Sequence, residues 1–203
     1  MIVDNTKVPM TDEQLRLLAL HTCQWCDAVL QQGKRFLNAF EATNGKLPWE
    51  EDDHSSMFLA DKVFLITAIH HAIVNLERFN DELVQGGDSS FQPVLDAIAT
   101  KEERQKIREW RNMNEHDIDY MLGRGRKQHG FVSKVKKENL EIETNAFTTY
   151  LNGNIGIFLI GSIEIDKLLI KFKDNLPSIK IKTEEVFNHT LLYKSNDFQN
   201  SIN

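Results

Sequence analysis

Apolar side chains recur every three to four residues over the first part of the chain, which is the spacing of one helix face. Thr11-Asp12-Glu13-Gln14 has the form of a capping box, in which the side chains of Thr11 and Gln14 each bond the other residue's backbone N–H. Asn44-Gly45 is a typical helix stop. We therefore predict one long helix between them. Its apolar stripe comprises Leu15, Leu18, Thr22, Cys26, Val29, Phe36 and Phe40.

A second apolar stripe begins near Ser55 and ends at Gly86-Gly87. Two long helices joined by a short connection most simply pack antiparallel. A short helix with Pro93 in its first turn follows, and Thr100-Lys101-Glu102-Glu103 is a second capping box. This box opens a further helix, which should close by Gly123. The pattern predicts an up-and-down bundle of about four helices.

The pattern changes after a predicted basic loop over residues 125–137, where it becomes alternating instead of helical. Two strand-like runs flank Asn152-Gly153, which is typical of a β-hairpin. Gly161-Ser162 then opens a helix that Pro177 should end, and a last short helix is predicted from Thr183.

These elements predict an α+β fold that is mainly α. Residues 11–125 form the helical bundle, and residues 126–203 form a β-hairpin and C-terminal helices packed on the bundle as one unit. No apolar run approaches the roughly 18 residues needed to span a bilayer, and the first ten residues have no hydrophobic signal core. We therefore expect a cytoplasmic protein without a membrane partner.

Charge is unevenly distributed along the chain. The whole protein carries −6, whereas residues 101–137 hold eleven Lys and Arg against six Asp and Glu, a local +5. An acidic protein does not bind polyanions unselectively, so any nucleic-acid contact should concentrate in this segment. For charge alone, a solvated helix face followed by a basic loop is the favoured explanation.

The richest chemistry lies late in the last helix of the predicted bundle. Asn112, His116 and Tyr120 stand at i, i+4 and i+8 and form one polar row, with Arg111 beside it. An alternative without chemistry is also open: Arg111 and Glu115, at i and i+4, can form a helix-surface salt bridge and leave His116 as an exposed residue near the helix end.

Arg111, Asn112 and His116 resemble the signature of the HEPN superfamily, which is an Arg followed by a polar residue and, four to six residues after the Arg, a His. Many members are small helical bundles that act as metal-independent ribonucleases. The resemblance implies a homodimer that cuts RNA without a cofactor, with the 2′-hydroxyl of the RNA as the nucleophile. It also implies a toxin–antitoxin or defence setting. An antitoxin protein is then a further partner. Ile118 stands where some toxins have Tyr, and Tyr120 is the nearby alternative.

These residue types suit that reaction. A His titrates near neutral pH, so His116 can take the 2′-OH proton or protonate the leaving 5′-oxygen. Arg111 supplies a permanent positive fork for the charge that grows on the phosphate oxygens. Asn112 can orient the imidazole or the phosphate by hydrogen bonds. The candidate catalytic residues are therefore Arg111, Asn112, His116 and Tyr120.

A metal-binding bundle is a second hypothesis. Histidines fall on three predicted helices and acidic residues lie near them; the set comprises His21, His70, His71, His116, Glu77 and Asp117. No Glu-x-x-His or His-x-x-x-His pair occurs on one helix, so histidines in the core or at its boundary are favoured. Cys23 and Cys26 lack a second metal-ligating pair, and buried reduced thiols are the favoured interpretation.

A third hypothesis needs no catalysis. Long amphipathic helices, with aromatic side chains on the hairpin, can form a homodimeric interaction module. The aromatic residues in question are Phe147, Tyr150 and Phe158. In that case the polar row fixes the register between subunits.

Overall fold

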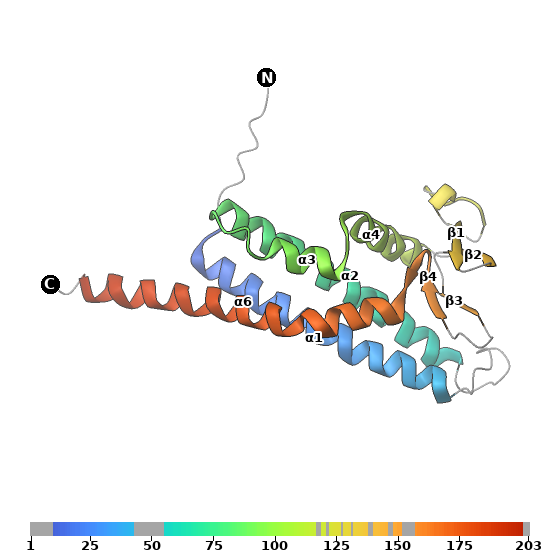
Figure 1. Ribbon diagram of the computed structural model, residues 1–203, viewed down its shortest axis with the longest axis horizontal. Coiled ribbons are helices and arrows are strands. Elements are labelled where there is room, and N and C mark those ends of the chain that lie inside the picture. The colour runs from blue at the N-terminus through green and yellow to red at the C-terminus, as the bar shows by residue number, and fades with distance from the viewer. Residues whose placement is uncertain are drawn as a thin grey trace, which may run out of the picture.

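The fold is mainly helical, and a helical bundle accounts for it (Figure 1). The computed structural model describes residues 10–42, 55–116, 119–120, 122–126, 128–130, 132–137, 140–145, 148–151 and 157–200. Its elements are α1 (Asp12–Ala42), α2 (Ser55–Gln85), α3 (Gln92–Ile98), α4 (Lys101–Glu115), η2 (Gln128–Gly130), β1 (Val132–Lys137), β2 (Leu140–Asn145), β3 (Thr148–Leu151), β4 (Ile157–Ile160), β5 (Ile163–Glu164) and α6 (Ile165–Asn200).

The two long helices, α1 and α2, pack against each other and run antiparallel. The hydroxyl of Thr22 lies 3.4 Å from the carbonyl of Asn75, and ten residues further along α1 the side chain of Gln32 donates to Asp61 at 2.9 Å. The capping box before α1 is confirmed, because Thr11 N–H donates to Gln14 Oε1 at 2.9 Å and Gln14 N–H donates back to Thr11 Oγ1 at 3.3 Å.

The second capping box is also confirmed, and it starts α4. Thr100 Oγ1 accepts from Glu103 N–H at 3.2 Å, while Glu103 Oε2 accepts from Thr100 N–H at 2.7 Å. α4 packs on α2 with opposite direction, since Arg104 contacts Glu77, while the later Arg111 lies near His70, which comes earlier in α2. The helix ends earlier than predicted, at Glu115 and not near Gly123.

One prediction for the C-terminal region is wrong: Pro177 does not end the last helix, and no new helix begins at Thr183. α6 continues from Ile165 to Asn200 with Pro177 inside it and lies along α1 (Figure 1). A mid-helix Pro removes one backbone hydrogen bond. The helix persists because Phe172 before it and Ile179 after it are both fully buried in the same core.

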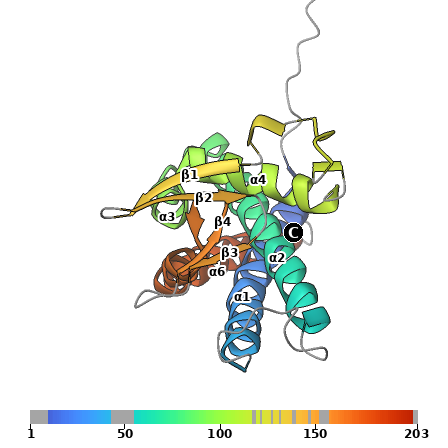
Figure 2. The ribbon, with the colours of Figure 1, turned by 90° about the vertical axis from the view of Figure 1, so that its right-hand side faces the viewer.

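The strands gather at the end of the molecule where α6 begins (Figures 1 and 2). Residues 132–137, predicted as part of a basic loop, form β1, which pairs antiparallel with β2. This part of the loop prediction is wrong: residues 132–137 pair with residues 140–145 at six successive positions, and Val132 and Val135 are β-branched residues that favour a strand. β3 and β4 are antiparallel partners, and β5 follows β4. The predicted turn at Asn152-Gly153 lies outside the described residues, so the hairpin as such stays a prediction.

One apolar core joins α1, α2, α3, α4 and the first half of α6. Trp110 of α4 packs directly over Gly161, where a Cβ would come within 2.6 Å of the indole nitrogen. Gly161 also has a φ of +56°, so a side chain there is strained as well as crowded. This contact holds α4 against the turn between β4 and β5. Among the described helices, none combines the length and apolarity that crossing a bilayer requires.

Candidate functional site

The last turn of α4 holds the predicted polar residues, which we call the α4 terminal site: Arg111, Asn112, Glu115 and His116. Arg111 Nη2 lies 2.6 Å from Glu115 Oε1, with side-chain exposures of 36% and 48%. Arg111 Nη1 also lies 3.5 Å from Asn112 Oδ1, a long contact. The predicted salt bridge between Arg111 and Glu115 is therefore present.

Asn112 and His116 are both exposed. His116 is the C-cap of α4, and its backbone N–H donates to the carbonyl of Asn112 at 3.3 Å. The backbone of His116 has left the helical conformation, with φ −120° and ψ 37°. The imidazole thus stands at the helix end, where Asn112 lies one turn below it.

Tyr120 does not continue the exposed row. α4 ends before it, and its side chain is buried at 6% exposure. Its ring packs against Gly125, where a Cβ would come within 2.3 Å of the ring carbons. The side chain of Gln128 donates to the Tyr120 carbonyl at 3.0 Å and accepts from Gly125 N–H at 3.1 Å. The backbone N–H of Tyr120 donates to the His116 carbonyl at 3.2 Å, but the Tyr120 side chain is buried, where it anchors the chain after α4, and does not share the exposed face of His116.

Arg111 also lies near His70 of α2. Burial lowers the pKa of His70, and the charges of His71, Arg111 and Arg108 lower it further, while Glu115 opposes them. The sequence grouped His70 with possible metal ligands. The spacing of the residues connects His70 to Arg111. Arg104 of α4 faces Glu77 of α2, and the two helices are antiparallel. Seven residues are two helical turns, so Arg111, seven residues after Arg104, is level with His70, seven residues before Glu77.

The first half of α4 contacts α2 and α3 through a clustered ion pair. Arg104 donates to Glu77 at 2.9 Å, to Asp96 at 2.9 Å and to the carbonyl of Ala99 at 2.6 Å. Arg108 bonds the other oxygen of Glu77. The hydrogen bonds from Arg104 and then Gln92 hold the pKa of Asp96 below its usual range. Both oxygens of Glu77 are thus occupied by arginines, which leaves this carboxylate no place in a metal site.

The described residues contain no group of three His, Cys, Asp or Glu side chains arranged to hold a metal ion. His71 stacks on Trp25 with ring centroids 4.5 Å apart, and His21 is exposed on α1. Asp117 lies outside the described residues. Cys26 is fully buried, and burial raises the pKa of its thiol strongly, which makes it an inert core residue.

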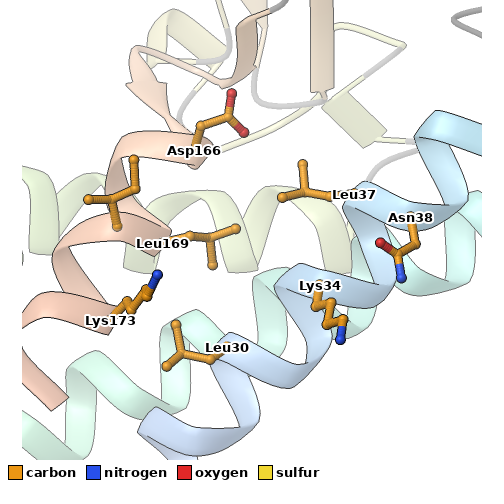
Figure 3. A pocket seen from close by; sticks show the side chains of 8 residues that line it. Leu30, Lys34, Leu37, Asn38, Asp166, Leu169 and Lys173 are labelled. Carbon is orange, nitrogen blue, oxygen red and sulfur yellow. The ribbon is translucent and has the colours of Figure 1, made fainter.

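A hollow of about 380 Å³ lies between α1 and α6 (Figure 3). Leu30, Leu37 and Leu169 give it an apolar floor, and Lys34 and Lys173 lie at its edge. Leu169 fills the space beside Gly33, where a Cβ would come within 2.6 Å of it. The hollow is lined by residues of these two helices and does not contain the residues of the α4 terminal site.

Comparisons with protein-family models, with curated proteins and with solved structures found no match to this chain.

Proposed function

We propose that this chain is a HEPN-like, metal-independent endoribonuclease that acts as a homodimer, as a cytoplasmic toxin or defence protein with an antitoxin as a further partner. The observation that carries the proposal is the placement of Arg111, Asn112 and His116 in the last turn of α4. Asn112 and His116 are exposed, and Arg111 is half-buried beside them. A substrate can reach all three, and the resemblance to the HEPN signature assigns them a reaction.

The chemistry follows from the residue types. The 2′-oxygen of RNA forms a bond to phosphorus while the bond from phosphorus to the 5′-oxygen breaks, leaving a cyclic phosphate. His116 takes the 2′-OH proton or gives a proton to the departing 5′-oxygen. A two-fold dimer supplies two such imidazoles, one for each proton transfer. Arg111 stabilises the growing charge on the non-bridging oxygens.

The salt bridge of Arg111 does not prevent this role. An exposed i,i+4 pair stabilises a helix by only about 0.3–0.5 kcal/mol. A phosphate offers the guanidinium a bidentate partner of comparable or greater strength. Glu115 therefore orients Arg111 in the free protein, and a phosphate of the RNA replaces Glu115 as the partner of the guanidinium when RNA binds.

An exposed apolar surface supports the dimer. Val63 and Phe64 of α2 are 43% and 59% exposed. Val63 stands seven residues before His70, so both lie on the same face of α2. Two copies that pair through this surface would bring their α4 terminal sites toward a shared groove. The same surface favours a second candidate function, a non-catalytic homodimeric interaction module.

Purified protein and a labelled single-stranded RNA separate these two functions. We expect cleavage that persists in EDTA, yields a cyclic phosphate end and is lost in His116→Ala. Lys106→Ala is the matched control, because Lys106 is a partly exposed cation of the same helix whose ion pair among the described residues is with Glu102. A stable dimer in light scattering without any cleavage supports the interaction module and contradicts the nuclease.

A further inference from the structure

The contact between α2 and α4 has a repeating polar pattern with one exception. Arg104, Arg108 and Arg111 stand at i, i+4 and i+7 and so lie on one face of α4. The first two bind the carboxylate of Glu77 on α2. One heptad back along α2, at the level of Arg111, stands the imidazole of His70 and not a second carboxylate.

We propose that His70 is a further substrate-binding residue of this site, which together with Arg111 holds a phosphate group of the RNA backbone between α2 and α4. This inference rests on the proposed function and names a residue that the HEPN-like motif does not contain.

The replacement of a carboxylate by an imidazole matters because of charge. Arg104 donates to Glu77 and to groups of α3 and its C-terminal end, and Arg108 also donates to Glu77. Arg111 has its carboxylate contact on its own helix, with Glu115, at an exposed position. A carboxylate on α2 at position 70 would neutralise Arg111 and repel phosphate. A neutral imidazole does neither, so the end of the α2–α4 contact keeps a guanidinium that an external anion can bind.

The protonation state of His70 suits a neutral donor. Its Nδ1 atom is buried and has no hydrogen-bond partner among the residues that the structure describes. A charged imidazole would place an N–H there without an acceptor, which is costly in a buried position. Burial and the neighbouring His71, Arg111 and Arg108 lower the pKa of His70, against the smaller effect of Glu115. The ring is therefore neutral near pH 7, with its proton on Nε2, and Nε2–H can donate to a phosphate oxygen.

His71 shows that this feature belongs to His70 and not to histidines of α2 in general. The ring of His71 stacks on Trp25 of α1, at 4.5 Å between centroids and 24° between planes. It is thus held in the contact between α1 and α2, and its edge contacts the ring of His70 at 5.5 Å between centroids. The two neighbouring residues have the same chemistry and different surroundings, so they form a matched pair for substitution.

The test uses a single-stranded 2′-O-methyl oligonucleotide, which offers phosphates but has no free 2′-OH and is not cut. Fluorescence anisotropy measures its binding to the full chain. We expect His70→Gln to weaken binding at least several-fold, whereas His71→Gln binds as the wild type does. In wild-type protein, the imidazole NMR signals of His70 should move when the oligonucleotide is added, and this movement should be lost in Arg111→Ala.

Two results would overturn the inference. One is wild-type affinity in His70→Gln; the other, independent of whether that variant folds, is a His70 signal that stays in place while the oligonucleotide binds. Cleavage of unmodified RNA tests the proposed function separately. If His116→Ala abolishes cleavage while the His70 signal does not respond, the nuclease stands and the role of His70 falls. If the oligonucleotide moves the His70 signal but no RNA is cut, the phosphate site stands without the nuclease, and absence of both binding and cleavage removes both.

Discussion

Arg104 and Arg111 lie on the same face of α4, two turns apart, and their surroundings differ in almost every respect. The side chain of Arg104 is 7% exposed and makes three hydrogen bonds to groups on or next to other helices. The side chain of Arg111 is 36% exposed, and the contacts recorded for its guanidinium are with Glu115 and Asn112 of its own helix. One guanidinium holds the fold together, and the other remains accessible.

The backbone of α4 follows the same division. Its start is fixed by the reciprocal bonds of Thr100 and Glu103. Its end stops at His116 in a non-helical conformation, ahead of the buried Tyr120. A rigid start and an accessible end are what a binding site on a scaffold helix requires, because the rigid part positions the side chains and the accessible part meets the ligand.

The largest expected effect is on stability, from Arg104→Ala. Removing one partner of a buried ion pair costs about 3–5 kcal/mol, because the remaining charge keeps its desolvation cost. We expect the lower end of that range, since Glu77 retains Arg108. Arg111→Ala should cost less than about 0.5 kcal/mol. Urea unfolding of both variants measures the difference, and equal losses would contradict the division of α4 into two halves.

A smaller loss is expected from Thr100→Ala. The substitution removes the side-chain acceptor for Glu103 N–H, which typically costs about 1 kcal/mol. His116→Ala, at the other end of α4, keeps the backbone bond to the Asn112 carbonyl and should change the free energy of unfolding by less. Thermal unfolding followed by circular dichroism compares them. A larger loss in His116→Ala would show that the imidazole has a structural role.

The first half of α4 was the more predictable of the two. The spacing of Thr100 and Glu103 predicts the capping box, and this is confirmed because capping depends on neighbours three residues apart. The salt bridge of Arg111 with Glu115 was predicted for the same reason. Local spacing therefore accounts for what lies within one helix.

The side-chain contacts between α2 and α4 were not predicted. The ion pairs of Glu77 with two arginines of α4, and the position of His70 beside Arg111, depend on how α2 is aligned along α4. Spacing within a single helix does not specify that alignment. Tyr120 was placed on the exposed row because the helix was expected to continue past Glu115. Pro177 was expected to end a helix, and burial of side chains on both sides of it outweighs the lost hydrogen bond.

The two halves should also respond to acid at different pH. The pKa of His70 lies below its ordinary 6.5, so the unfolded chain binds protons before the folded one and stability falls as pH drops below 6.5. The pKa of Asp96, lowered by Arg104, lies below its ordinary 3.8, so its contribution is lost only as pH falls below that value. We expect His70→Gln to reduce the loss that begins below pH 6.5 and Asp96→Asn to change only the loss that begins below pH 3.8. Urea midpoints measured from pH 7 to 3 test this, and His70→Gln should leave the lower step in place.

The smallest expected change in stability comes from Glu115→Gln, and it bears most directly on what the accessible half of α4 does. Removing the exposed carboxylate should cost at most about 0.5 kcal/mol, because the pair is solvated and lies within one helix. If Glu115 only stabilises the helix, nothing else changes. If it holds the place of a phosphate, its removal frees Arg111 and also removes a negative charge from the site. Binding of the 2′-O-methyl oligonucleotide should then tighten several-fold and weaken again in Glu115→Gln combined with Arg111→Ala.

The control is Glu102→Gln, which breaks the i,i+4 pair of Glu102 with Lys106 in the same helix and should leave binding unchanged. Equal binding by Glu115→Gln and the wild type would mean that Arg111 is a helix-surface residue like Lys106, and the contrast with Arg104 would be one of burial alone.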